Sequence, residues 1–168
     1  IKISNEIDKT EFKTISQASF NKTDFKKNYE KLDSGTKRSL NFIKKRIINF
    51  HKSIKTKDLK IKDGIFSFLG QIHKPIEKIG IYAPGGRAVY PSSILMTASV
   101  ARVAGSEEIS LFFPSSSKEA KTLMLGTAHI AGISNAYNFG GAHAIAAMAY
   151  GTETISKLDK SCGPGNNY

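Results

Sequence analysis

Beyond residue 75, short apolar runs alternate regularly with longer segments that are rich in alanine and other small or apolar residues. The short runs have the length of buried strands, and the longer segments have the length of helices that end at a glycine. Regular alternation of this kind is typical of right-handed βαβ units with a parallel sheet. The predicted strands cover residues 79–82, 109–113, 135–139 and 160–162, and the predicted helices cover 92–104, 118–131 and 142–150.

The first 75 residues are more polar and carry most of the lysines. Thr23 is a candidate N-cap, with Asp24 in the first turn of the helix that follows. A second helix has one apolar face, formed by Leu40, Ile43, Ile47 and Phe50 at steps of three and four residues. The elements predicted here are extended or irregular chain at 1–21, helices at 24–32 and 36–53, a lysine-rich connector at 54–63 and a strand at 65–72.

These patterns predict an α/β protein with an incomplete Rossmann-like parallel sheet, flanked by helices and preceded by an N-terminal helical hairpin. The compositional change at about residue 75 predicts two parts: a helical, basic region with one strand at 1–75, and a truncated Rossmann-like βαβ domain at 76–168. Residues 94–104 are almost entirely apolar or small, so this helix is expected to pack on both sides, as in an inner layer of a larger assembly.

Composition excludes several classes of protein. With 40% hydrophobic and 23% charged residues, the chain is typical of a globular protein rather than a disordered one. No apolar run approaches the roughly 20 residues that span a bilayer, and the first residues lack the apolar centre of a signal peptide. Cys162 is the single cysteine, which excludes an internal disulfide and a zinc site of the CxxC type. We expect a cytoplasmic protein that does not bind membranes.

The net charge of +11 is unevenly distributed. Residues 1–75 carry 18 Lys and Arg against 8 Asp and Glu, a net of +10, whereas residues 76–168 carry 7 against 6, a net of +1. We interpret the excess as a solvated basic face, because lysines are spread along helices and tryptophan is absent. The alternative is an RNA-binding module built on the N-terminal helices, which charge reversal of Lys44, Lys45 and Arg46 would test. We expect no nucleic-acid partner.

Three glycine-bearing turns follow predicted strands: PGG at 84–86, GGA at 140–142 and GPGN at 163–166. The dinucleotide fingerprint GxGxxG and the phosphate-binding loop GxxxxGK[ST] are both absent. Each turn alone is ordinary turn chemistry. In this order, however, the turns would lie along one edge of a parallel sheet, where backbone N–H groups and helix N-termini can approach a ligand. We expect the functional site at that edge.

Together, GIYAPGGRAVYPSSILMTASVARVAG (80–105), GGAHAIAAMAYGTETISKLDK (140–160) and GPGN (163–166) closely resemble histidinol dehydrogenase. The resemblance is dense over 75–168 and looser upstream. It implies a zinc-containing homodimer that oxidises L-histidinol to L-histidine through an aldehyde, reduces two NAD⁺ and closes histidine biosynthesis. In the family, zinc orients the substrate and a Glu-His pair serves as acid and base.

The resemblance also implies which residues contact NAD: Tyr82, Asn166 and the position of His143, where the family usually has glutamine. An imidazole donates or accepts one hydrogen bond but lacks the simultaneous donor and acceptor of an amide, and a protonated His143 can contact a phosphate. Alternative interpretations stay open. Tyr82 can be a core residue, His143 a capping or surface residue, and Asn166 only a turn former.

The remaining candidates are interpreted as structural. His51, His73 and His129 are isolated in the sequence, without partners at metal-ligand spacing. Arg87 follows the PGG turn and can face either a phosphate or solvent. Cys162 is read as a small buried hydrophobe rather than a catalytic nucleophile.

The family's zinc ligands, its acid–base pair and nearly all of its substrate contacts correspond to positions after residue 168. We therefore expect this chain to be the N-terminal portion of such an enzyme, with no catalytic or metal-binding residue of its own and no activity alone. The alternative is a non-catalytic nucleotide-binding or assembly module derived from the same fold.

Overall fold

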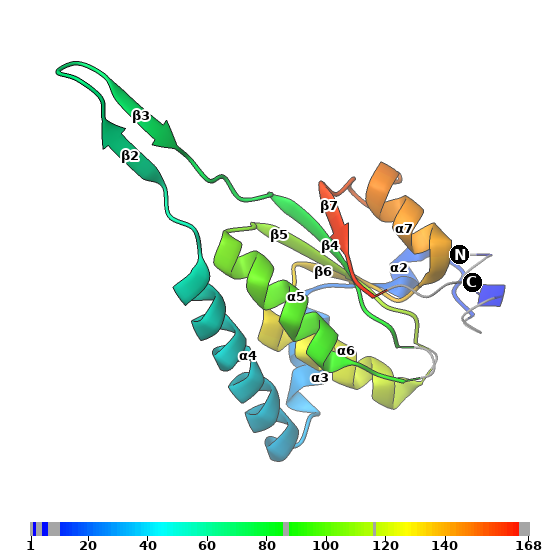
Figure 1. The fold of residues 1–168 in the computed structure, drawn as a ribbon. Helices are drawn as coiled ribbons and strands as arrows, with labels where there is room; N and C mark the ends of the chain where they lie inside the picture. The colour runs from blue at the N-terminus through cyan, green and yellow to red at the C-terminus, as the bar shows by residue number, and fades with distance from the viewer. Residues whose placement is uncertain (1, 3–4, 7–10, 86–87, 116, 165–168) are drawn as a thin grey trace.

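A computed structural model describes residues 2, 5–6, 11–85, 88–115 and 117–164. Its described residues form a five-stranded sheet in the order β1-β6-β5-β4-β7, with helices on both faces (Figure 1). The strands β6, β5, β4 and β7 are parallel to one another, and within this sheet only β1 runs antiparallel to its neighbour, β6. The strands of this sheet are β1 Ser19–Phe20, β4 Lys78–Tyr82, β5 Glu108–Phe112, β6 Asn135–Tyr137 and β7 Lys160–Cys162. The α/β class with a mostly parallel sheet flanked by helices is confirmed.

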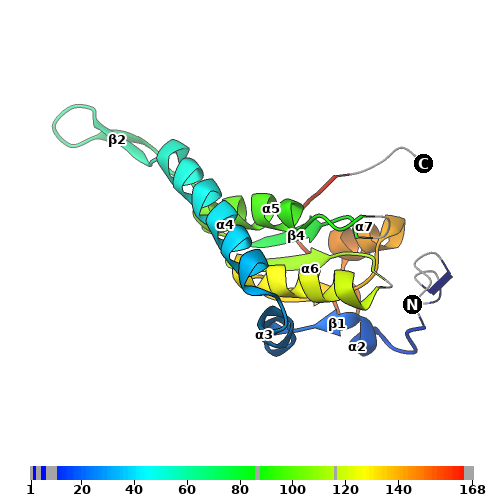
Figure 2. The same cartoon turned by 90° about the horizontal axis from the view of Figure 1, so that it is seen from below.

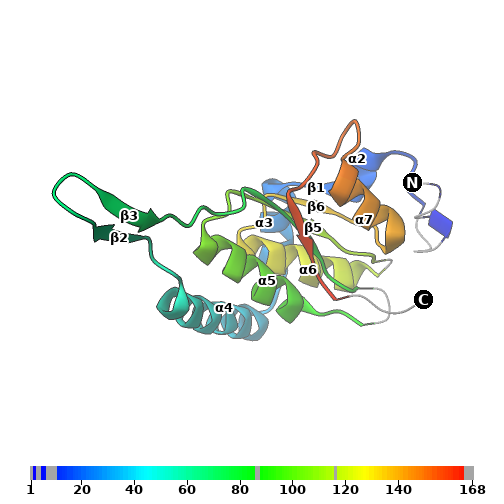
Figure 3. The same ribbon diagram turned by 45° about the horizontal axis from the view of Figure 1, so that its top comes forward.

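The described helices lie on both sides of the five-stranded sheet. They are α2 Ile15–Ala18, α3 Lys22–Glu30, α4 Ser34–Ile54, α5 Pro91–Ala104, α6 Lys118–Ala131 and α7 Gly141–Tyr150. α5 and α6 cover one face of the sheet, α3 and α4 pack on their outer side, and α7 covers the other face (Figures 2 and 3). In the part of the chain that the structure describes, no helix is both long and apolar enough to cross a bilayer.

Side chains alternate across the sheet as the strand period requires. Ile109 and Leu111 of β5 belong to the core cluster shared with α5 and α6, whereas Phe112 belongs to the cluster shared with α7. α3 and α4 extend the first cluster through Phe25 and Leu40, which are 1% and 5% exposed. Burial on both faces explains why the strand sequences read as continuous apolar runs.

The helix ends follow local capping chemistry. The expected left-handed glycines are present after α5 and α6, with φ of 112° at Gly105 and 74° at Gly132. The predicted N-cap at Thr23 is wrong: α3 begins earlier, and Asn21 forms a capping box with Asp24. Asp33 caps α4 by accepting a hydrogen bond from the Thr36 N–H at 2.9 Å. Hydrogen bonds from the Thr36 side chain and then from its backbone N–H lower the pKa of the Asp33 carboxyl.

The connector predicted at 54–63 is wrong, because β2 Leu59–Lys62 lies within it. β2 pairs antiparallel with β3 Phe68–Gln71, so the predicted strand at 65–72 belongs to a hairpin that projects from the body (Figure 1). The strand was missed because its sequence, LKIK, alternates only two apolar residues with lysines. In the hairpin, the Lys60 ammonium lies 3.9 Å from the centroid of the Phe68 ring. We call residues 59–71 the β2–β3 arm.

The irregular chain predicted at 1–21 is also partly wrong. Its described part contains α2 and β1, and β1 pairs Ser19 with Tyr137 of β6. Smaller differences occur at element ends: β5 spans 108–112 rather than 109–113, β6 stops at Tyr137, and α7 begins at Gly141. The helix at 118–131 and the strand at 160–162 have the predicted bounds. The division at residue 75 stays a prediction.

Candidate functional site

The loops that follow β4 and β6 both pack against Pro114, in the loop that follows β5. A Cβ atom on Gly85 would lie 2.6 Å from the carbonyl oxygen of Pro114, and one on Gly140 would lie 2.8 Å from its ring. Neither position has room for a side chain, so glycine allows the three loops to meet. Because β4, β5 and β6 are parallel, this meeting point is the carboxyl edge of the sheet.

Asn138 joins two of these loops and was not singled out by the sequence. The side chain is fully buried; its Oδ1 accepts a hydrogen bond from the Ser115 N–H at 2.7 Å, and its Nδ2 donates to the Ser115 carbonyl at 2.8 Å. The Asn138 backbone N–H donates to the carbonyl of Ala18 at 2.7 Å. Residue 138 falls inside the predicted strand 135–139, whereas the observed strand ends at Tyr137 and leaves Asn138 in the loop that follows it.

The strand order reverses between β4 and β7. β5 and β6 extend the sheet on one side of β4, and the chain then crosses over through α7, on the opposite face from α5 and α6, to place β7 on the other side (Figure 3). In open α/β sheets, ligands bind in the crevice at the carboxyl ends of strands where the order reverses. The candidate site therefore lies where the chain leaves β4 and β7.

Tyr82 occupies this position as the last residue of β4. It is partly buried and packs against the apolar cluster on the α7 side of the sheet. Gly163, directly after β7, lies so close that a Cβ atom there would overlap the carbonyl oxygen of Tyr82. The structure thus brings Tyr82 together with the start of the GPGN turn. Asn166 and Arg87 lie outside the described residues.

His143 lies in the first turn of α7. Its ring stacks on Phe139, with centroids 5.6 Å apart and an interplanar angle of 17°. Phe139 belongs to the same cluster against which Tyr82 packs, so both predicted residues border one apolar region. His143 and Phe139 both line a small cavity of about 280 Å³, with Ile15, Thr152 and Thr154 among the other lining residues. The His143 side chain is partly exposed and stands near the N-terminal end of the helix, where anions are favoured.

The other residues considered in the sequence have structural surroundings. The His51 ring meets Phe50 edge-on at 5.2 Å, the His129 ring lies 4.8 Å from Tyr29, and His73 pairs with Asp58 at 3.6 Å. Cys162 is partly buried, and its Sγ donates to the Gly80 carbonyl at 3.6 Å. Burial raises the pKa of the Cys162 thiol, although the charge of Lys160 opposes the shift. A protonated thiol is a poor nucleophile.

The site suits a dinucleotide in two respects. Its glycine loops bring backbone close to the crevice, where N–H groups can bind phosphate, and the aromatic residue Tyr82 ends the strand that borders it. The described residues do not suit zinc: they contain no group of three or more His, Cys, Asp or Glu that could hold a metal ion.

Comparison with known proteins gives a consistent result. A sequence profile of the family "Histidinol dehydrogenase" matches residues 1–168. The chain is 37% identical to a histidinol dehydrogenase of Neisseria meningitidis serogroup A and 38% identical to one of Acinetobacter baylyi, in each case over 100% of this chain and 39% of the relative. A crystal structure of histidinol dehydrogenase from Elizabethkingia anophelis superposes with a TM-score of 0.88 and 34% identity, covering 100% of this chain and 38% of that chain. The chain therefore spans about two fifths of the length of these relatives.

Proposed function

The chain belongs to the histidinol dehydrogenase family, and from this premise we propose that it provides part of the NAD site of an enzyme that oxidises L-histidinol to L-histidine through L-histidinal. In this proposal the working enzyme is a zinc-dependent homodimer in the cytoplasm that serves histidine biosynthesis. Residues 1–75 and 76–168 act as an N-terminal helical region and a nucleotide-binding domain.

One observation carries the proposal at the level of the site: the packing of Gly163 against Tyr82, where the strand order reverses. This contact joins the loops after β4 and β7, the two loops that a dinucleotide must touch when it lies across such a crevice. Tyr82, His143 and Asn166 are the proposed coenzyme contacts. Family membership supports the chemistry, and the crevice supports the location.

NAD⁺, when bound, accepts the hydride that the alcohol carbon loses. The residues of this chain would orient the coenzyme. The partly buried Tyr82 would contact the coenzyme at the end of β4, and the close-packed loop at 83–85 would supply backbone groups to bind it. The first turn of α7, with His143, offers N–H groups and one imidazole to a phosphate or an amide.

The described residues supply no zinc ligands and no acid–base pair in this proposal. Both would come from outside residues 1–168, since the relatives are longer than this chain. We expect the 168-residue chain to bind coenzyme without turning over histidinol.

The test is NADH formation from L-histidinol and NAD⁺ with added zinc, on purified protein whose intact mass has been measured. The proposal predicts no turnover by material of 18.3 kDa, and turnover by a longer protein that includes this chain. Turnover at 18.3 kDa would contradict the placement of the catalytic groups. If both the 18.3 kDa chain and the longer protein bind NAD without turning over histidinol, a non-catalytic nucleotide-binding module would be favoured instead.

A further inference from the structure

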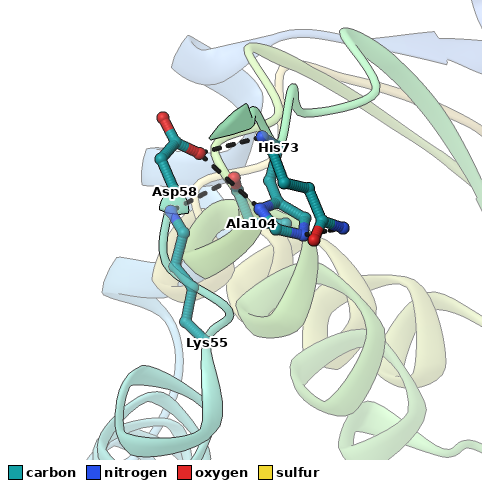
Figure 4. Close-up of polar contacts among 5 residues, drawn as sticks. Lys55, Asp58, His73 and Ala104 are labelled. Atoms are coloured by element: carbon teal, nitrogen blue, oxygen red, sulfur yellow. Dashed lines mark hydrogen bonds and ion pairs between the residues drawn. The ribbon is translucent and has the colours of Figure 1, made fainter. Parts of the chain in front are cut away.

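Asn138 links the loop after β6 to the loop after β5 through contacts that are closed to solvent. Its side chain is fully buried, its Oδ1 accepts a hydrogen bond from the Ser115 N–H at 2.7 Å, and its Nδ2 donates to the Ser115 carbonyl at 2.8 Å. The link between the ends of α4 and α5 is different, because Lys55 donates to the Ala104 carbonyl at 3.3 Å in an exposed position (Figure 4). Hydrogen bonds in a buried environment are electrostatically stronger than those in water, so the Asn138 link can hold a loop in one place.

The peptide group between Pro114 and Ser115 separates Asn138 from the loop after β4. Its N–H donates to Asn138, and its carbonyl oxygen would lie 2.6 Å from a Cβ atom added to Gly85. Pro114, Ser115 and Gly85 are all buried. A peptide group is planar and resists rotation, and in the trans form its N–H and carbonyl point in opposite directions. The peptide group is therefore a rigid spacer, with Asn138 on one side and Gly85 on the other.

The loop at 83–85 is held at both of its ends by β5 and the residues that follow it. Ala83 is fully buried, and its N–H donates to the Phe112 carbonyl at 2.9 Å, directly after β4. Two residues later, Gly85 packs against the carbonyl of Pro114. A tilt of the Pro114 peptide group would therefore move Gly85 while Ala83 stays in place, and the backbone of the loop would change its shape.

This link can act in two ways. If Asn138 is only structural, its loss lowers stability but leaves the folded protein with its full affinity for NAD⁺. The loop at 83–85, however, borders the proposed coenzyme crevice and has its position set by the spacer. We propose that Asn138 is a positioning residue for the coenzyme, which places the loop at 83–85 for NAD⁺ binding through the peptide group between Pro114 and Ser115. This inference rests on the proposed function, in which that loop supplies backbone groups to the coenzyme.

The experiment is calorimetric titration of NAD⁺ at about pH 6 into the unmodified protein, Asn138→Ala and Asn138→Asp, each shown to be folded by circular dichroism. The backbone N–H of Asn138, which donates to the Ala18 carbonyl, is kept in both variants, so only the link to Ser115 changes. His143, the titratable group proposed to contact the coenzyme, is the same in all three proteins.

Asn138→Ala removes the link and should weaken NAD⁺ binding by about fivefold or more. In Asn138→Asp the new carboxyl group is buried, which raises its pKa and keeps it neutral at about pH 6. A neutral carboxyl group both donates and accepts, as the amide does, so this variant should bind within about twofold of the unmodified protein. A purely structural role predicts one affinity for all three folded proteins.

Hydrogen exchange followed by mass spectrometry reports on the loop without coenzyme. In the peptide that covers residues 83–85, Asn138→Ala should raise the exchange rate by about tenfold, and Asn138→Asp should leave it unchanged at the same pH. The β2–β3 arm, which projects from the body, is the internal reference and should exchange equally in all three proteins (Figure 1).

Asn41→Ala is the matched control, since the Asn41 amide also donates to a backbone carbonyl, that of Lys37 at 2.8 Å, but at an exposed site in α4. It should change neither NAD⁺ affinity nor exchange at 83–85. If Asn138→Ala does not fold, Asn138→Ser takes its place, because a water molecule beside the smaller side chain can satisfy part of the Ser115 backbone.

Three results would overturn the proposal. Unchanged NAD⁺ affinity in folded Asn138→Ala, whatever its exchange rate, would make Asn138 purely structural and leave the proposed function intact. An equal loss of affinity in Asn138→Ala and Asn138→Asp would show that the hydrogen bonds to Ser115 do not carry the effect. Absence of NAD⁺ binding to the unmodified protein would overturn the proposed function, and with it the role of Asn138 toward the coenzyme.

Discussion

The side chain of Asn138 holds the backbone of Ser115 from both sides, accepting from its N–H at 2.7 Å and donating to its carbonyl at 2.8 Å. This pair joins the loops that follow β5 and β6 beneath the carboxyl edge of the sheet. All four polar groups are buried with their partners, so the arrangement fixes the relative position of the two loops. The glycine contacts around Pro114 depend on that position.

Replacement of Asn138 by alanine should therefore be strongly destabilising. It removes two hydrogen bonds and leaves a buried N–H and carbonyl of Ser115 without partners, which predicts a loss of about 2–4 kcal/mol in the free energy of unfolding. Urea unfolding measures the loss. Asn41→Ala is the matched control, because that amide donates to the Lys37 carbonyl at an exposed site and should cost less than about 1 kcal/mol. Similar small losses for both variants would contradict the assigned role.

Gly85→Ala tests the close approach of the loops after β4 and β5. The added Cβ would lie 2.6 Å from the carbonyl oxygen of Pro114, and the backbone must shift to relieve this overlap. We predict a loss of about 1–3 kcal/mol in stability, together with weaker coenzyme binding.

Gly35→Ala is the control for this variant, since the nearest atom to its Cβ belongs to the side chain of Asp33 at 3.0 Å in the first turn of α4. Its stability should stay within about 1 kcal/mol of the unmodified protein. An unchanged stability for Gly85→Ala would show that the two loops can separate freely.

Cys162 should react slowly with iodoacetamide. Burial raises the pKa of its thiol, and only the thiolate is alkylated, so at neutral pH the rate should fall below that of N-acetylcysteine and rise as the pH increases. The folded protein holds the thiol proton of Cys162 more tightly than the unfolded protein does. The stability that this protonation contributes is therefore present below the pKa of the thiol in the unfolded chain, and it is lost as the pH rises through the pKa of the thiol in the folded protein. In denaturing urea the rate should equal that of the free thiol. Faster reaction in the folded protein would identify an activated cysteine instead.

Much of the fold could be predicted because several elements carry strong local signals. The helix at 118–131 combines a helical apolar face with a left-handed glycine, Gly132, at its end, and both its ends are observed where predicted. The parallel sheet followed from alternating strand and helix lengths. The order of glycine turns also located the edge of the sheet at which Tyr82 and Gly163 meet.

The elements that were missed depend on partners distant in sequence. β1 has two residues, too few for a periodic pattern, and exists because β6 offers it hydrogen bonds. β2 was missed because it has only four residues, two of them lysines, and it forms by pairing with β3. Arg102 was overlooked because its role is tertiary: Nη1 donates to the carbonyls of Ser106 and Glu107 at 2.9 and 2.7 Å, and Nη2 donates to Gly132, which ties the ends of α5 and α6 together.

The resemblance implies a glutamine at the position of His143, and this expectation has a measurable consequence in the proposed coenzyme site. An amide can donate and accept at once, so His143→Gln should tighten NAD⁺ binding severalfold, the effect of about one hydrogen bond. Isothermal titration calorimetry at neutral pH measures the change. Weaker binding by His143→Gln would mean that the imidazole itself makes the better contact, for example as a cation near a phosphate.

The central claim is that NAD⁺ binds where the strand order reverses, beside Tyr82. The most direct measurement is calorimetric titration of NAD⁺ into the unmodified protein, Tyr82→Ala and the control Tyr150→Ala, whose side chain is 84% exposed at the end of α7. The account predicts saturable binding that Tyr82→Ala weakens by about tenfold, the effect of losing roughly 1–2 kcal/mol of aromatic contact, while Tyr150→Ala leaves it unchanged. Absence of binding to the unmodified protein, or equal affinities for all three proteins, would contradict it.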